Sequence, residues 1–475
     1  MATHNNKYLL LNLPNPVNQN IYREFAGGFG TLGSLSSETL IPTYLLYGAS
    51  GLRDMGADFE VLDAQGLMYD YETSLEVIDS SSPDVVITWL SLPSLYDDLD
   101  LVEKIKEKVG TVVVLGAIGN VMPEKVLEKA DLVVKAGYPH YNAVKNIFKG
   151  IEEDDFAQIE GAFYYDENQI LVQNPVKYEE TVDNLWFDVY KEIPINSYLG
   201  DVEGIDKSFN CVPILTAVGC PYSCMYCPYP LGYGRKVVHK SVKQTVKEIK
   251  YLKENFGING FVFRAQNFTY DHKWINEFCD TIIKENLNIN WLAETRADLV
   301  SPELLQKMKS SGCFRIHYGV ETTADELQKI GKPGLDINKI KETFKITRDL
   351  KIFTMAHMII GLPGENNKTL DKTIQTIIEL NPDAMSVNIA TPYPGTKLFD
   401  IADNEKLIET YDFSKYTSFD SVMRTKNYSK KELLEAKKRM KREFIKNKIL
   451  CDSSFRKRYL RSIPRKLKAR MISFV

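Results

Sequence analysis

Short apolar runs alternate with amphipathic stretches along most of the chain, the pattern of proteins built from repeated strand–helix units. In the first 150 residues, the runs that predict buried parallel strands are KYLLLNLP, FEVLDAQ, PDVVITWLS, TVVVLGAIG and DLVVKAG. Helical patterns lie between these runs and after the last one. Five such strands predict a doubly wound, Rossmann-like parallel sheet, so we expect residues 1–150 to form one α/β domain.

The same alternation resumes at Val212 with longer units. Six strand–helix units fit within residues 206–400, beginning with VPILTAV and ending with DAMSVNIATPYPGT. They predict a partial, TIM-like (β/α)6 barrel with its chemistry at the carboxyl ends of the strands. Residues 151–205 read as a connector with hairpin character in GAFYYDENQILVQNP, and residues 401–475 as a helical, basic C-terminal region.

Ligands of doubly wound sheets bind beyond the carboxyl ends of the strands, so the loops there are candidate sites. One of these loops carries Gly116, Ala117 and Gly119, whose small size would let a bulky ligand approach the backbone closely. Ser91 and Gly137 lie in neighbouring loops of the same edge. The first strand is not followed by GxGxxG, which disfavours a dinucleotide.

Length and composition narrow the class of protein. A chain of 475 residues is too long for one ordinary core, and 44% hydrophobic with 26% charged residues is typical of soluble globular proteins. No apolar run approaches the roughly 18 residues of a membrane-spanning helix, and the first residues, MATHNNKYLLLNLP, lack the layout of a secretory signal. We therefore expect a cytoplasmic protein with reduced thiols.

The segment GCPYSCMYCPYP places Cys220, Cys224 and Cys227 at C-x3-C-x2-C spacing, directly after the first predicted barrel strand. The other four cysteines are scattered, which argues against a disulfide framework. Structural zinc takes four protein ligands, and no second CxxC or HxxxH lies nearby. A cubane iron–sulfur cluster held by three cysteines would keep one iron open to a small chelating molecule.

This loop and the motifs after it resemble those of radical S-adenosylmethionine (SAM) enzymes, in particular the cobalamin-binding branch. The later motifs are GYGRK, INWLAETRADLVSPELLQKMKSSGCFRIHYGVET, HMIIGLPGE and TPYPGT, so the resemblance covers about residues 205–400. It implies a 4Fe–4S cluster on the three cysteines, with SAM on the open iron. It also implies an external electron donor, flavodoxin- or ferredoxin-like. Reductive cleavage of SAM would then give a 5′-deoxyadenosyl radical that abstracts hydrogen from a substrate.

By position in these motifs, the resemblance implies a SAM site formed by Tyr226, Glu294, Glu321, Lys332, His357 and Gly361. Ribose hydroxyls and an ammonium need acceptors such as Glu294 and Glu321, and a carboxylate favours Lys332. Alternatively, each charge is a strand-end group satisfied by a neighbour, and Gly361 simply forms a turn. After the second barrel strand the family often carries acidic residues where this chain has Arg264-Ala265-Gln266-Asn267, so contacts from that strand stay open.

The first domain resembles the cobalamin-binding domain that precedes such barrels, through VVVLGAIGNVMPEKVL and ADLVVKAGYP. The resemblance implies cobalamin contacts from Ser91, Gly116, Ala117, Gly119 and Gly137. Two features depart from the family: the D-x-H-x-x-G signature is missing, and an acidic loop is replaced by KAGY. Any cobalamin would therefore bind without a protein histidine below the cobalt. The alternative is a domain that kept the fold and lost the cofactor.

The C-terminal region is strongly basic. Residues 430–475 carry 17 Lys or Arg against 4 acidic residues, a net charge of +13, interleaved with large apolar residues. This pattern predicts peripheral contact with the inner face of the cell membrane, with the alternative of a helix packed on its own acidic protein. The tail lacks the pattern of an RNA-binding module, so nucleic acid is an unlikely partner.

Together these features predict an enzyme that abstracts hydrogen from an unactivated carbon and transfers a methyl group to it. The expected substrate is a small molecule, with a membrane lipid as the more specific hypothesis. Radical cyclisation or C–C bond formation on a lipid or tetrapyrrole is the enzymatic alternative, and a nucleic-acid-binding or RNA-modifying protein is the alternative from another class. The protein would position the cofactors and exclude water.

Overall fold

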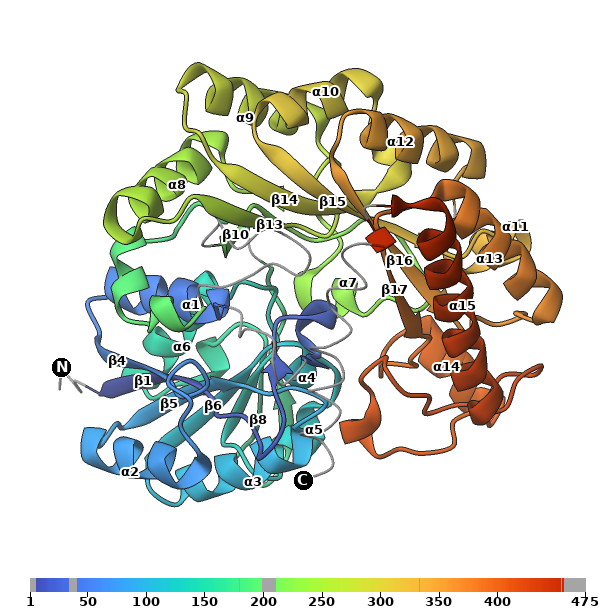
Figure 1. Cartoon of the computed structure of the whole chain (residues 1–475). Helices are drawn as coiled ribbons and strands as arrows, with labels where there is room; N and C mark the ends of the chain where they lie inside the picture. Colours follow the sequence, from blue (N-terminus) through green and yellow to red (C-terminus); the bar gives the residue numbers. More distant parts are fainter. Residues whose placement is uncertain are drawn as a thin grey trace.

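The computed structural model describes residues 6–33, 41–178, 180–198, 211–332, 334–453 and 455–456. Two α/β units lie one above the other in Figure 1, the first coloured blue to teal and the second green to orange. The C-terminal helix, in red, lies along the side of the second unit.

The first unit contains the expected parallel sheet. Its strand order is β4-β1-β5-β6-β7, continued by β8 and β9. The parallel strands are β1 (Lys7–Asn12), β4 (Asp58–Asp63), β5 (Val85–Trp89), β6 (Thr111–Leu115) and β7 (Leu132–Val134). Because β1 lies between β4 and β5, the chain changes direction across the sheet at β1, where doubly wound folds bind ligands. The predicted doubly wound fold is confirmed.

Helices cover both faces of this sheet, which explains why its central strands are apolar throughout. Alternate strand residues pack into two separate clusters, one with α1 and α6 and one with α2 and α3. The covering helices are α1 (Thr43–Asp54), α6 (Tyr141–Glu152), α2 (Tyr71–Ser81) and α3 (Leu95–Lys106). Two short helices, α4 (Ala117–Val121) and α5 (Pro123–Leu127), follow β6.

The predicted hairpin after residue 150 belongs to the first sheet. Strands β8 (Ala162–Tyr165) and β9 (Leu171–Gln173) pair antiparallel with each other, and β8 pairs antiparallel with β7. The first unit therefore extends past the boundary expected from sequence. The aromatic stretch that follows forms short 3-10 turns, Phe187–Lys191 and Ile195–Tyr198.

The second unit is a six-stranded sheet in which all neighbouring strands are parallel and follow chain order, as predicted. Its strands are β10 (Cys211–Leu215), β13 (Gly260–Arg264), β14 (Asn290–Arg296), β15 (Cys313–Glu321), β16 (Phe353–Ile360) and β17 (Ala384–Ile389). The covering helices are α8 (Val242–Phe256), α9 (His272–Lys284), α10 (Pro302–Ser310), α12 (Ile337–Asp349) and α13 (Asn367–Leu380). A shorter helix, α11 (Asp325–Gly331), follows β15.

The described part of the basic tail is a wall of the barrel. After α14 (Lys397–Asn404), helix α15 (Lys430–Cys451) packs against β17 and α13. Leu433, Met440 and Phe444, three of the large apolar residues that the sequence pattern assigned to membrane contact, are buried in the protein. The packing alternative therefore holds for α15. Residues 457–475 lie outside the described residues, and none of the described helices is long and apolar enough to cross a bilayer.

A buried ion pair ties the two units together. Lys240 Nζ lies 2.5 Å from Glu248 Oε2, and both side chains are almost completely buried. Tyr190 donates its hydroxyl to Glu248 Oε1 at 2.7 Å, and the Lys240 ammonium lies over the ring of Tyr47 on α1. Side chains from the first unit, the connector and the barrel thus meet at one charge pair.

We expect Lys240→Met to lower the free energy of unfolding by about 3–5 kcal/mol, because it leaves the Glu248 carboxylate buried without its partner. Urea unfolding would measure the change. The matched control is Lys250→Met, which removes an exposed pair with Glu285 and should cost less than about 1 kcal/mol. Equal effects of the two substitutions would contradict a structural role for the buried pair.

Candidate active site

The three-cysteine loop begins just after the first barrel strand. It leaves β11 (Ala217–Val218) and ends in the short helix α7 (Tyr229–Tyr233). At its start Gly219 has φ +86°, and a Cβ there would lie 1.9 Å from the Lys236 carbonyl oxygen, so only glycine fits. Two backbone hydrogen bonds close the loop: Cys220 N–H donates to Gly234 at 3.1 Å, and Cys227 N–H donates to Cys224 at 3.1 Å.

Cations and an amide surround the thiols. Burial raises the pKa of Cys220, Cys224 and Cys227, while the charges of Lys332 and Arg296 lower the pKa of the first two. Asn267 donates from Nδ2 to Cys220 Sγ at 3.4 Å. Asn267 follows the second barrel strand, where the departure from the family pattern left contacts open, and no sequence signal pointed to this bond.

The donor set fits a cluster rather than a single ion. Within the described residues, no three His, Cys, Asp or Glu side chains are arranged to hold a single metal ion. Three thiols on one loop, close to two cations that would stabilise thiolates, suit an iron–sulfur cluster with an open iron. The cysteines named from sequence would therefore be its ligands.

The structure pairs two of the residues expected to bind SAM. Lys332 Nζ lies 3.0 Å from Glu321 Oε1 and donates to the Gly319 carbonyl oxygen at 2.7 Å. Both side chains are largely buried at the carboxyl end of β15. Tyr226 reaches the same region, because a Cβ on Gly331, next to Lys332, would lie 3.7 Å from the Tyr226 ring. Each of these two charges is thus satisfied by its neighbour.

The other predicted acceptors lie on neighbouring strands. Glu294 is exposed on β14 and is in register with His317 on β15, while His357 on β16 is in register with Ser386 on β17. His357 Nδ1 and Ser386 Oγ are 2.7 Å apart. Sequence reasoning missed His317, whose ring lies 5.3 Å from the His357 ring. Burial and the neighbouring His357 and Arg315 lower the pKa of His317, so its ring is neutral.

Gly361 lies in a turn closed by a buried carboxyl group. It has φ +92°, and its N–H donates to Glu365 Oε2 at 2.5 Å. Glu365 is fully buried, and within the described residues its Oε1 has no partner. Burial raises the pKa of Glu365 to about 7, against the opposing effect of the Gly361 bond.

This carboxyl group should make stability depend on pH. The folded-state pKa of Glu365 is about 7, above its ordinary value of 4.5, so its contribution is complete below pH 4.5 and lost as the pH rises through 7. The shift corresponds to about 3 kcal/mol. Urea unfolding at pH 5 and at pH 8 measures the free energy of unfolding on both sides of this change. We expect Glu365→Gln, which keeps an acceptor for the Gly361 N–H, to remove the fall in that free energy between the two pH values. Glu379→Gln, at an exposed group whose pKa is lowered, is the control and should leave the loss in place.

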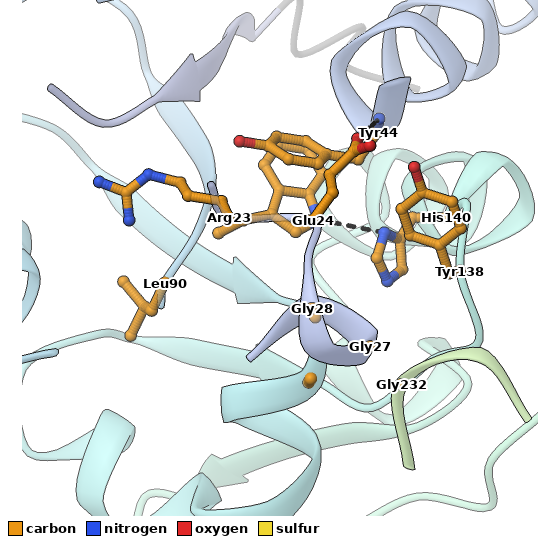
Figure 2. Close-up of a pocket in the computed structure, with 12 residues that line it drawn as sticks. Arg23, Glu24, Gly27, Gly28, Tyr44, Leu90, Tyr138, His140 and Gly232 are labelled. Atoms are coloured by element: carbon orange, nitrogen blue, oxygen red, sulfur yellow. Dashed lines mark hydrogen bonds between the residues drawn. The ribbon is translucent and has the colours of Figure 1, made fainter. Parts of the chain in front are cut away.

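The residues expected to contact cobalamin follow the carboxyl ends of β5, β6 and β7. Gly116 and Ala117 line a pocket at the edge of the first sheet, and Gly137 lines a different one. Ser91 belongs to the buried network around the Arg23–Asp98 ion pair, and Gly119 packs against Val133. Figure 2 shows the first pocket, with Arg23 and Leu90 on one side and Tyr138 and His140 on the other.

Helix α7 closes this pocket. Gly232 accepts from the Tyr138 N–H at 3.1 Å, and Leu231 accepts from Asn120 Nδ2 at 3.0 Å. A Cβ on Gly27 would lie 2.6 Å from Tyr229 Cα, so the backbones touch. The remaining cavity is about 20 Å³, room for about one water molecule.

His140 lies in this pocket in a defined tautomer. Its Nδ1 accepts from Trp89 Nε1 at 3.1 Å, as the dashed line in Figure 2 shows. The indole can only donate, so the proton of the neutral imidazole is on Nε2. Burial lowers the pKa of His140 to about 3, and within the described residues Nε2 has no partner. A protonated Nε2 is a hydrogen-bond donor and offers no lone pair.

A family model matches the second unit of the chain, and relatives match most of both units. Residues 214–377 match the family described as the Radical SAM superfamily. An uncharacterized methyltransferase of Pyrococcus horikoshii is 26% identical over 401 residues, which cover 82% of this chain and 85% of that protein. The anaerobic magnesium-protoporphyrin IX monomethyl ester cyclase of Cereibacter sphaeroides is 27% identical over 438 residues, covering 88% and 70%.

A solved structure shares the fold of both units. The radical SAM methyltransferase TsrM from Kitasatospora setae, with cobalamin and a 4Fe–4S cluster bound, superposes with a TM-score of 0.66 at 18% identity. The match covers 85% of this chain and 76% of that one. The two units of this chain therefore share the fold of that structure, and the match of residues 214–377 to the Radical SAM superfamily implies a 4Fe–4S cluster and SAM.

Proposed function

Since residues 214–377 form a radical SAM domain, we propose that this protein is a radical SAM enzyme that abstracts hydrogen from an unactivated carbon of a small molecule and transfers a methyl group to it. The observation that carries the proposal is the three-thiol loop at the carboxyl end of the first barrel strand, next to Lys332, Arg296 and Asn267. When bound, the cluster supplies the electron that cleaves SAM.

The protein's own side chains would hold the cluster and orient SAM. Cys220, Cys224 and Cys227 would bind three irons, and Asn267 would donate a hydrogen bond to one of the thiolates. Lys332 would bind the SAM carboxylate by leaving Glu321, which would then accept from a hydroxyl or the ammonium. The electron would come from a flavodoxin- or ferredoxin-like donor.

Methyl transfer is supported by the similarity to the methyltransferase over most of both chains. Radical cyclisation is the second candidate, because the similarity to the cyclase covers 88% of this chain. Cobalamin, if bound, would supply the methyl group. Product analysis with SAM carrying a labelled methyl group separates the two reactions.

We expect anaerobically reconstituted protein to bind about four irons and four sulfides. Cys224→Ala should abolish SAM cleavage, measured as 5′-deoxyadenosine, because the cluster then loses one of its three ligands. Cys451→Ala changes an exposed cysteine on α15, well outside the loop, and should bind iron and cleave SAM like the unaltered protein. SAM cleavage by a variant that lacks all three loop cysteines would exclude radical chemistry at this loop.

A membrane lipid is the more specific substrate hypothesis. Because α15 packs against the barrel, the basic residues available for membrane contact are those that follow it. Residues 457–475 contain seven Lys or Arg and no acidic residue. Each such charge near an anionic bilayer contributes on the order of 1 kcal/mol. These residues alone could therefore hold the enzyme reversibly at a membrane.

Removal of residues 457–475 tests this hypothesis without disturbing α15. The lipid hypothesis predicts that the full chain floats with anionic liposomes at low salt, and that the shortened chain does not float but still cleaves SAM. Neutral liposomes are the control, because the attraction is electrostatic and screened by salt. Equal flotation of both chains, or none, would remove the support for a lipid substrate.

A further inference from the structure

Arg264, the last residue of β13, carries a charge that no acceptor in the described part of the chain satisfies. Its guanidinium lies over the ring of Phe25, 4.7 Å from the ring centre, and it makes no hydrogen bond or ion pair among the described residues. Two buried arginines near the site differ from Arg264. Arg23 pairs with Asp98 at 2.6 Å, and Arg296 pairs with Asp298 at 2.8 Å.

The surroundings of Arg264 come from both units. The hydroxyls of Tyr229 and Tyr233, on α7, and the carboxylate of Glu24, from the first unit, raise the pKa of Arg264, although burial alone would lower it. Glu24 is already used elsewhere, because its Oε1 accepts from Thr43 Oγ1 at 2.7 Å and from the Tyr44 N–H at 3.0 Å. Glu24 acts on the charge of Arg264, but among the described residues no hydrogen bond or ion pair joins the two side chains.

Arg264 is distinct from the cation expected to bind SAM. Lys332 is paired at the end of β15, two strands away from β13 in the sheet. Arg264 instead faces α7, which directly follows the last cluster cysteine and contacts the first unit. It is partly exposed, so a ligand can reach it. A group bound there would lie between the cluster loop and the first unit.

We propose that Arg264 binds a carboxylate or phosphate of the substrate, so that the substrate is an organic anion with an apolar body. The planar guanidinium has donors in a fork that matches either group, and the Phe25 ring holds its plane. The Phe25 ring also offers an apolar face beside the guanidinium, and the rings of Tyr229 and Tyr233, whose hydroxyls act on the Arg264 charge, stack with centres 5.5 Å apart. The inference rests on the proposed function, because it names the substrate class of that site.

Benzoate and phenyl phosphate test the proposal as probes, with benzamide as the neutral comparison. We expect calorimetry on the cluster-loaded protein to show at least about tenfold tighter binding of one anion than of benzamide. The preferred anion distinguishes a carboxylate from a phosphate. Arg264→Gln should remove this preference and Arg264→Lys should keep part of it, because a lysine retains the charge but lacks the fork. Arg348→Gln, an exposed arginine on α12, should change nothing.

Two parallel measurements separate the possible failures. Arg264→Gln should bind and cleave SAM as the unaltered protein does and should not lower the melting temperature, because it removes a cation without an acceptor. If Arg264→Gln binds SAM more weakly, Arg264 belongs to the SAM site. If its melting temperature falls by a large amount, Arg264 is a structural partner of Glu24. Either result overturns the proposal. So does equal binding of anions and benzamide by the unaltered protein. Failure of that protein to cleave SAM would instead contradict the proposed function, while the anion measurement stands by itself.

Discussion

The contact between α7 and the edge of the first sheet is the constraint on which the site depends. The cluster loop is fixed to the barrel at its start by Gly219, and at its end it runs directly into α7. Helix α7 is in turn held by the Tyr138 N–H and by Asn120, both at the carboxyl edge of the first sheet. Figure 1 shows α7 between the two units. The first unit therefore acts on the cluster loop through backbone and amide hydrogen bonds, with or without a cofactor of its own.

The same contact explains how the two sheets can serve one reaction. Each is a parallel sheet, and parallel sheets bring their reactive loops to their carboxyl edges. Where the two edges meet, aromatic side chains fill the space. The ring centres of Tyr138 and Tyr233 are 4.4 Å apart, and those of Tyr44 and Trp89 are also 4.4 Å apart. This packing leaves a cavity of only about 20 Å³ between the two edges. It also leaves Arg264 as a charge at the boundary between this interface and the reactive side of the barrel.

Charge is placed differently in the two units. The first unit satisfies its deepest charges internally, as the Arg23–Asp98 pair does, which suits a scaffold. Around the cluster loop the cations Lys332 and Arg296 act on the thiols, and Glu294 stays exposed. Lys332 is paired with Glu321, but both side chains can exchange that partner for a ligand. A ligand can therefore bind them without a large change of structure.

The sequence by itself was enough to predict the strands and helices and to name the candidate cluster ligands. Strands and helices could be predicted because their apolar periods are local, and Cys220, Cys224 and Cys227 because their spacing lies within one loop. The partners of Cys220 and Gly361, namely Asn267 and Glu365, depend on strand register and turn geometry, as does the meeting of His317 with His357. The closure of the first-sheet edge by α7 and the burial of Phe444 were also decided only by the tertiary structure. Both depend on which surfaces meet across hundreds of residues, and no local pattern in a single sequence encodes that.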